Sequence, residues 1–87
     1  MNFTVIWLTS AEEDLASVWL AALDREQITQ SANEIDTRLE AEPEMQGESR
    51  SGQRRILFVA PLGVTFEVNE ADRLVRVLDV WRFTTHH

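Results

Sequence analysis

The stretch from Gly47 to Val68, "GESRSGQRRILFVAPLGVTFEV", begins as part of a polar loop and continues as two apolar segments separated by a short break. Gln53 to Ala60 is predicted to be a strand, because β-branched and aromatic residues favour extended backbone. The letters "PLG" predict a tight turn. Val64 to Asn69 is then predicted to be the next strand. These predictions together indicate an antiparallel hairpin.

The sequence after this hairpin predicts one more strand. The letters "NEAD" indicate a second turn, and Arg73 to Phe83 is again rich in valine and leucine. Three strands joined by two short turns form an antiparallel meander.

The segment before the hairpin predicts a strand and two helices. Phe3 to Leu8 is apolar on both faces, which indicates a strand in the interior of the sheet. Ser10 with Glu13, and Asp24 with Gln27, match the pattern of a capping box at the start of a helix. The very short link between the two helices predicts an antiparallel helix hairpin.

Each predicted helix carries an apolar stripe at helical spacing. The first stripe includes Trp19, which is therefore predicted to lie in the core. Pro43 is expected to end the second helix. The stripes consist of Leu15, Val18, Trp19, Ala22 and Leu23 in the first helix, and Ile28, Ala32, Ile35 and Leu39 in the second.

The predicted order is β-α-α-β-β-β in one α+β domain that spans residues 1–87. The helix hairpin is expected to pack on one face of a small, mainly antiparallel sheet. No element remains to cover the other face, although the strands carry apolar residues on both sides. Exposed apolar surface of this kind is typical of partner sites, so association with a partner protein or a second copy is expected.

The composition limits the classes of function. The chain has 15 acidic residues, 8 arginines and no lysine or cysteine, with a net charge of −7. This acidity argues against broad coating of nucleic acid. No apolar run is long enough to span a membrane, and no signal peptide is recognisable, so a cytoplasmic protein is expected. Neither metal-ligand spacing nor a glycine-rich phosphate loop is present, so we expect no metal or cofactor.

The arginines of the second half of the chain are candidate contacts to phosphate or to a partner protein. The alternative is that they form cross-strand or surface ion pairs, for example with Glu67. Counting residues alternately along the last strand predicts that Arg76 and Arg82 share a face. Aromatic side chains on the uncovered face would anchor a partner, and the alternative for Trp7 and Trp81 is a place in the core. The candidates are Arg50, Arg54, Arg55, Arg76 and Arg82 among the arginines, and Trp7, Trp81 and Phe83 among the aromatic residues.

The predicted element order resembles the RelE/ParE family of type II toxins. Three stretches carry the resemblance along nearly the whole chain: "ALDREQITQSANEIDTRLEAEPEMQGESR", "RRILFVAPLGVTFEV" and "DRLVRVLDVW". The resemblance implies a toxin that is bound by a cognate antitoxin. One branch of the family cleaves messenger RNA on the ribosome, and another poisons DNA gyrase.

The resemblance also implies where catalytic residues of the RNA-cleaving branch would lie. Arg54 and Arg55 match the basic residues of one strand, and Arg82 lies one position before another expected basic site. His86 is a candidate acid or base. Gly63 and Val64 stand where a further basic residue is expected, and the chain has no tyrosine. These departures favour action by protein binding, with gyrase as the more fitting target. A ribosome-dependent ribonuclease and a non-toxic interaction domain remain the alternatives.

Overall fold

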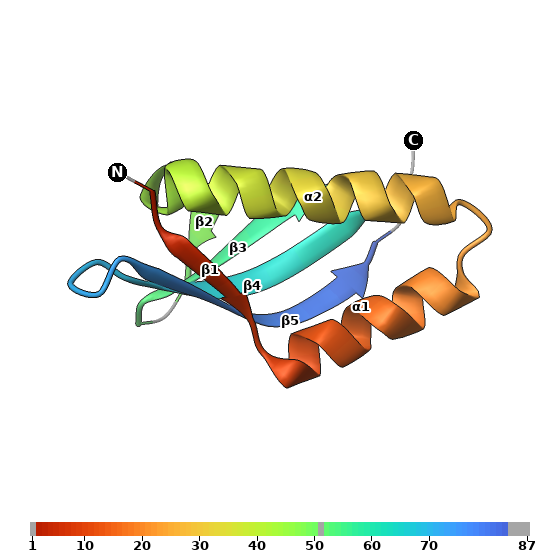
Figure 1. Ribbon diagram of the computed structural model, residues 1–87, viewed down its shortest axis with the longest axis horizontal. Helices are drawn as coiled ribbons and strands as arrows, with labels where there is room; N and C mark the ends of the chain where they lie inside the picture. Colours follow the sequence, from red (N-terminus) through yellow and green to blue (C-terminus); the bar gives the residue numbers. More distant parts are fainter. Residues whose placement is uncertain (1, 51, 84–87) are drawn as a thin grey trace.

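The computed structural model describes residues 2–50 and 52–83. Two helices lie on a five-stranded mixed sheet (Figure 1). The predicted order is confirmed, with a short 3₁₀ helix and a two-residue strand added inside the predicted polar loop. The elements are β1 (Thr4–Trp7), α1 (Thr9–Ala21), α2 (Arg25–Ala41), η1 (Pro43–Met45), β2 (Glu48–Ser49), β3 (Arg54–Val59), β4 (Leu62–Asn69) and β5 (Leu74–Arg82).

The strand order across the sheet is β1-β5-β4-β3-β2. The meander of β3, β4 and β5 is antiparallel as predicted, while β1 runs parallel to β5. The prediction that the first strand lies inside the sheet is wrong, because β1 has a neighbour on one side only. Its residues are apolar on both faces for another reason: Val5 and Trp7 pack towards the core, while Ile6 on the opposite face is 43% exposed.

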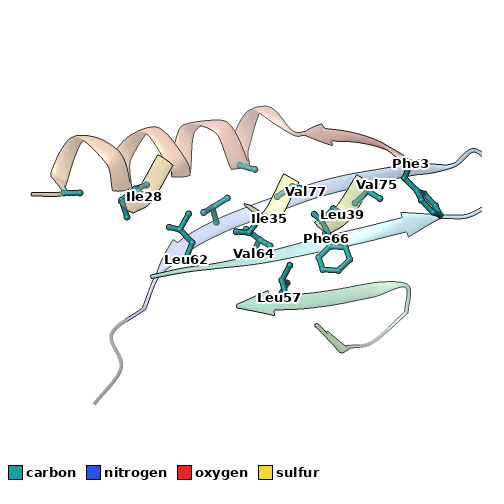
Figure 2. Close-up of a cluster of buried hydrophobic side chains, with 13 residues drawn as sticks. Phe3, Ile28, Ile35, Leu39, Leu57, Leu62, Val64, Phe66, Val75 and Val77 are labelled. Atoms are coloured by element: carbon teal, nitrogen blue, oxygen red, sulfur yellow. The ribbon is translucent and has the colours of Figure 1, made fainter. Parts of the chain in front are cut away.

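The core lies between α2 and the sheet (Figure 2). The predicted stripe of the second helix is confirmed, since Ile28, Ile35 and Leu39 are fully buried. Ser31, on the same helical face, is also buried and donates a hydrogen bond from Oγ to the carbonyl oxygen of Ala60 at 2.8 Å. The sheet residues of the core include Leu57, Leu62, Val64, Phe66, Val75 and Val77.

Helix α1 contributes less to the core than its stripe predicts. It ends at Ala21, and Leu23 beyond it is fully exposed. The prediction that Trp19 lies in the core is wrong: Trp19 is 39% exposed, its Nε1 donates to Thr29 Oγ1 at 3.2 Å, and the Arg25 guanidinium lies 4.6 Å from its ring centroid. The reason is that α1 and α2 diverge from their link, so that no layer covers this side of α1 (Figure 1). Replacement of Trp19 by alanine would therefore leave no cavity in the core.

A β-bulge interrupts the pairing of β4 with β5. Thr65 pairs with Asp79, but Phe66 pairs with Val77, so Leu78 is an extra residue on β5. A bulge leaves backbone groups without a ladder partner. Side chains of α1 bind groups in this region: Ser10 Oγ donates to the carbonyl oxygen of Leu78 at 2.9 Å, and Asp14 accepts from the backbone N–H of Val80 at 3.3 Å.

Neither predicted capping box forms, although both helices begin within one residue of the predicted start. The residue before α1 is Leu8, and Ser10 instead bonds to the bulge. Asp24 does precede α2 but makes no side-chain bond to the helix N-terminus. Its carboxylate binds Arg82, which lies 58 positions further along the chain. In both cases the expected capping side chain bonds to a residue of β5 instead of to the N-terminus of its own helix.

Candidate functional site

The sheet surface opposite the helices, here called the open face, carries three rows of side chains that run across the strands. Register and alternation place the rows side by side, two residues apart along β3 and β4. The aromatic row contains Phe58 and Trp81 on either side of Gly63; the middle row contains Glu48, Ile56, Thr65 and Asp79; the arginine row contains Arg54, Glu67 and Arg76.

The aromatic row forms a connected cluster with Phe83. The ring centroids of Phe58 and Trp81 are 6.0 Å apart and those of Phe58 and Phe83 are 5.1 Å apart, both edge to face. Gly63 allows the indole to lie against β4, because a Cβ at this position would lie 2.7 Å from Trp81 Cε2 and Cζ2. The position where the RNA-cleaving branch would place a basic side chain is therefore covered by Trp81. Phe58 remains 50% exposed, so the cluster offers apolar surface to solvent.

The arginine row has alternating charge. The Arg54 Nε lies 3.4 Å from Glu67 Oε1, and Glu67 is paired in register with Arg76 on its other side. Glu67 thus has an arginine as its register partner on each neighbouring strand. The exposed Arg54–Glu67 pair contributes little to stability, so Arg54 remains available for a partner.

Arg55 and Arg50 do not belong to this row. Arg55 faces the helix side, where its Nε donates to the carbonyl oxygen of Gln46 at 2.8 Å and its Nη2 to that of Gly47 at 3.2 Å. These bonds hold the segment between η1 and β2 against β3. Arg50 lies beyond the end of β2, and its Nη1 is 3.2 Å from Glu48 Oε2.

Arg82 forms a bidentate ion pair with Asp24 at the link between the helices. Its Nη1 and Nη2 lie 2.7 Å and 2.9 Å from the two carboxylate oxygens. The prediction that Arg76 and Arg82 share a face is wrong, because the bulge at Leu78 changes the alternation between them. The hydrogen bonds from Arg82 lower the pKa of Asp24, and the same bonds raise the pKa of Arg82.

The structure does not bring the candidate catalytic arginines together. Arg54 lies on the open face, Arg55 on the helix side of β3, and Arg82 beside the helix link. His86 and His87 lie outside the described residues.

Replacement of Arg82 by glutamine is expected to raise the pKa of the Asp24 carboxyl towards its ordinary value of 3.8. A carboxyl whose pKa is lowered by folding contributes stability above its unfolded pKa and loses it as pH falls through the folded pKa. Wild type should therefore lose this contribution below about pH 3.8, and the variant should show no such loss. A carbon NMR titration of the Asp24 carboxyl measures the effect. Arg38→Gln, which removes the ion pair with Glu34 on α2, is the matched control and should leave the Asp24 titration unchanged.

A second candidate surface, not anticipated from the sequence, lies between the two helices. Here α1 and α2 diverge beside the edge of β1 and leave a hollow of about 940 Å³, called the helix groove below. Trp7 lies in it, on the helix side of β1 rather than on the uncovered face, and donates from Nε1 to Asp36 Oδ1 at 3.0 Å. The groove is lined mostly by apolar side chains: Val5, Ile6, Trp7, Leu15, Ala16, Trp19, Leu20, Ile28 and Ala32, together with Glu12, Thr29, Asn33 and Asp36.

The polar members of the helix groove are mainly acidic or neutral. Glu12 stands on α1 and Asp36 on α2. The carboxyl of Glu40, one turn after Asp36, has a raised pKa, because it hydrogen-bonds to Asp36 and is repelled by its charge. Leu20 was not predicted to be a site residue. It follows Trp19 directly, outside the predicted apolar stripe of the first helix, and its side chain is 65% exposed.

Within residues 2–50 and 52–83, no three metal-binding side chains come together as a potential cation site. No helix among them has both the length and the apolar content needed to cross a bilayer.

Comparison with solved structures places the fold among toxin–antitoxin proteins. A chain of the RelBE2 toxin–antitoxin complex from Mycobacterium tuberculosis superposes with a TM-score of 0.75 at 16% identity, over 94% of this chain and 92% of that one. A chain of the chromosomal ParDE system from P. aeruginosa gives a TM-score of 0.70 at 15% identity, over 94% and 97% of the two chains. The isolated RelE toxin of E. coli gives 0.57 at 12% identity, over 98% and 88%. No family model matches the sequence, and neither does any curated protein. These likenesses establish the fold.

Proposed function

We propose that this chain, whose fold is that of the RelE and ParE toxins, is the toxin component of a type II toxin–antitoxin system and acts by binding protein partners. Its solved neighbours include toxin–antitoxin complexes. The observation that carries the proposal is the helix groove, because its mostly apolar lining includes the exposed side chains of Trp19 and Leu20, and exposed apolar surface of this kind is typical of partner sites.

The groove suits an antitoxin segment that is partly helical. Two diverging helices with apolar side chains between them form the kind of groove that accepts the apolar face of an amphipathic helix. The edge of β1 adjoins it. The backbone N–H of Thr4 donates to the carbonyl oxygen of Arg73, just before β5, and that of Leu8 donates to the carbonyl oxygen of Val77 in β5. Because alternate residues of a strand point their N–H groups to opposite sides, the N–H groups of Val5 and Trp7 point away from the sheet. A strand that continues from the bound helix would pair with this edge.

The open face is the proposed surface for the cellular target. Arg54, Arg76, Trp81 and Phe83 present the side-chain types that are enriched in protein interfaces. A target of the gyrase type requires such a binding surface and no catalytic group. A ribosome-dependent ribonuclease would need Arg54, Arg55 and Arg82 at one phosphate, and they occupy three separate positions. The third alternative, a solitary interaction domain, would lack an antitoxin gene beside it.

The test uses the product of the adjacent reading frame as the candidate antitoxin. Leu20→Glu is expected to weaken its binding about 30-fold or more, since a charge in an apolar groove costs at least the energy of one hot spot. Leu23→Glu is the matched control, because Leu23 is also exposed but lies outside the groove. Isothermal titration calorimetry measures both affinities, and far-UV circular dichroism checks folding.

The same preparations decide between the rival functions. The proposal expects inhibition of gyrase and no cleavage of ribosome-bound messenger RNA. Cleavage by wild type that is lost in an Arg54→Ala/Arg55→Ala variant would show that the ribonuclease alternative is correct. Equal weakening of antitoxin binding by Leu20→Glu and Leu23→Glu would show that the antitoxin does not bind in the helix groove.

A further inference from the structure

The charged side chains that line the helix groove lie at one end of it. Glu12 lies near the start of α1, and Asp36 lies in the second half of α2. Because α1 and α2 run in opposite directions from their link, both carboxylates lie towards the end where the helices are furthest apart (Figure 1). At the link end, Trp19 Nε1 donates to Thr29 Oγ1 and joins the two helices. The groove therefore has one acidic end and one mainly apolar end.

Neither of these carboxylates has a cation beside it. No ion pair between side chains of residues 2–50 and 52–83 involves Glu12 or Asp36. Asp36 accepts a hydrogen bond from the neutral indole of Trp7 and lies beside Glu40, whose carboxyl its charge repels. The acidic end of the groove is therefore not neutralised from within the described part of the chain.

Arg25 supplies positive charge at the other end of the groove. Its guanidinium lies over the Trp19 ring and donates to the carbonyl oxygens of Trp19 and Leu20 at the end of α1. The eight residues from Glu12 to Leu20 span about 12 Å of helix. This distance exceeds the screening length of about 8 Å at physiological salt, so Arg25 leaves the acidic end unneutralised.

We propose that the helix groove binds a basic amphipathic helix, whose apolar face covers the groove and whose lysine or arginine side chains pair with Glu12 and Asp36. This helix would be a segment of the antitoxin, so the proposal rests on the proposed function and adds the chemistry of the partner. The groove residues extend over about two turns of each helix, so the partner should carry apolar residues at positions i, i+4 and i+7. Its basic residues should lie at one end of this apolar face.

Burial on binding is the reason that the partner must be basic. Asp36 is already half-buried, and a helix laid over the apolar lining would remove more water from its carboxylate. Taking a charge out of water is costly unless an opposite charge compensates for the lost hydration. An acidic or uncharged segment would leave this cost uncompensated. A second copy of this chain is a poor occupant for the same reason, because residues 1–49 carry 11 acids and 2 arginines.

Two synthetic peptides of about 18 residues, or about five helical turns, test the inference. They share one leucine face and carry either lysines or glutamates on the rest of the helix surface. Fluorescence anisotropy with the full chain should show that the lysine peptide binds about tenfold more tightly than the glutamate peptide. This preference should shrink in about 1 M salt, where charges are screened within about 3 Å.

Substitutions in the groove show whether its carboxylates cause the preference. Asp36→Asn keeps an acceptor for the Trp7 indole but removes the charge, and it should weaken binding of the lysine peptide about fivefold. Glu12→Gln should weaken it about threefold, since Glu12 is more exposed. Glu26→Gln is the matched control, because Glu26 is an exposed acid of α2 that does not line the groove. It removes the same charge and should leave the affinity nearly unchanged, and far-UV circular dichroism checks the folding of all three variants.

Three results would overturn the inference: equal binding of the two peptides at low salt, no binding of the lysine peptide at millimolar concentration, or equal weakening by Glu26→Gln and the two groove substitutions. The product of the adjacent reading frame separates this inference from the proposed function. If its binding is weakened by Leu20→Glu but not by Asp36→Asn or Glu12→Gln, the groove binds an antitoxin without basic contacts, and only this inference fails. If the lysine peptide shows the expected preference but that product does not bind, the toxin assignment fails and the preference of the groove for a basic helix stands.

Discussion

Phe66→Ala is expected to lower the free energy of unfolding by about 3–5 kcal/mol, the usual cost of truncating a buried phenylalanine. Phe66 is the largest fully buried side chain, and it lies on the helix face of β4 among the residues of the α2 core (Figure 2). Small domains have about 5–15 kcal/mol of stability in total, and a short chain should lie near the lower limit. The variant should therefore be largely unfolded at room temperature. Urea denaturation followed by circular dichroism measures the loss.

Phe58→Ala is the matched control for this prediction. Both substitutions remove the same atoms, but Phe58 is 50% exposed on the open face. Its loss removes the edge contacts to Trp81 and Phe83 and is expected to cost about 1 kcal/mol. Similar urea midpoints for the two variants would show that the sheet buries both faces equally, which contradicts the arrangement described above.

Gly47→Ala is expected to cost about 2–5 kcal/mol, from the strain of a left-handed backbone together with overpacking. Gly47 has a φ of 66°, and a Cβ built on it would lie 2.1 Å from the carbonyl oxygen of Ile56. The backbone atoms of β3 cannot withdraw from this contact without breaking the sheet. The segment is also held by Arg55, which bonds to the carbonyl oxygens of Gln46 and Gly47.

Gly52→Ala provides the comparison, because Gly52 has a φ of 69° but no atom within 4 Å of a built Cβ. This variant carries the backbone strain alone and should lose only about 1–2 kcal/mol. Urea melts of the two variants separate strain from steric contact. Equal losses would mean that the close approach of Gly47 to β3 is absent in solution.

The two proposed binding surfaces depend on different features of one small fold. The helix groove exists because α1 diverges from α2 and leaves Trp19 and Leu20 uncovered. The open face exists because no element packs on that side of the sheet among the described residues. Since α2 alone covers the centre of the sheet, substitutions at either surface should alter binding more than folding.

Local patterns in the sequence determined the element order and the main core. The meander follows from β-branched segments separated by turn residues, and the stripe of α2 follows from helical spacing. Both are short-range regularities, because neighbouring residues set backbone conformation and face. The uncovered face could likewise be predicted, since both helices were expected to pack together on one face of the sheet. The positions of Phe58 and Trp81 near Gly63 required the strand register.

Tertiary structure alone decided which arginines act together. Counting by two from Arg76 to Arg82 assumes an uninterrupted strand, and the extra residue at Leu78 reverses the face of every later side chain. The bulge is accompanied by bonds from Ser10 and Asp14, which lie more than 60 positions away in the chain. The exposure of Trp19 was decided in the same way, by the divergence of α1 from α2. Contacts between distant segments set these features, and periodicity within a segment carries no information about them.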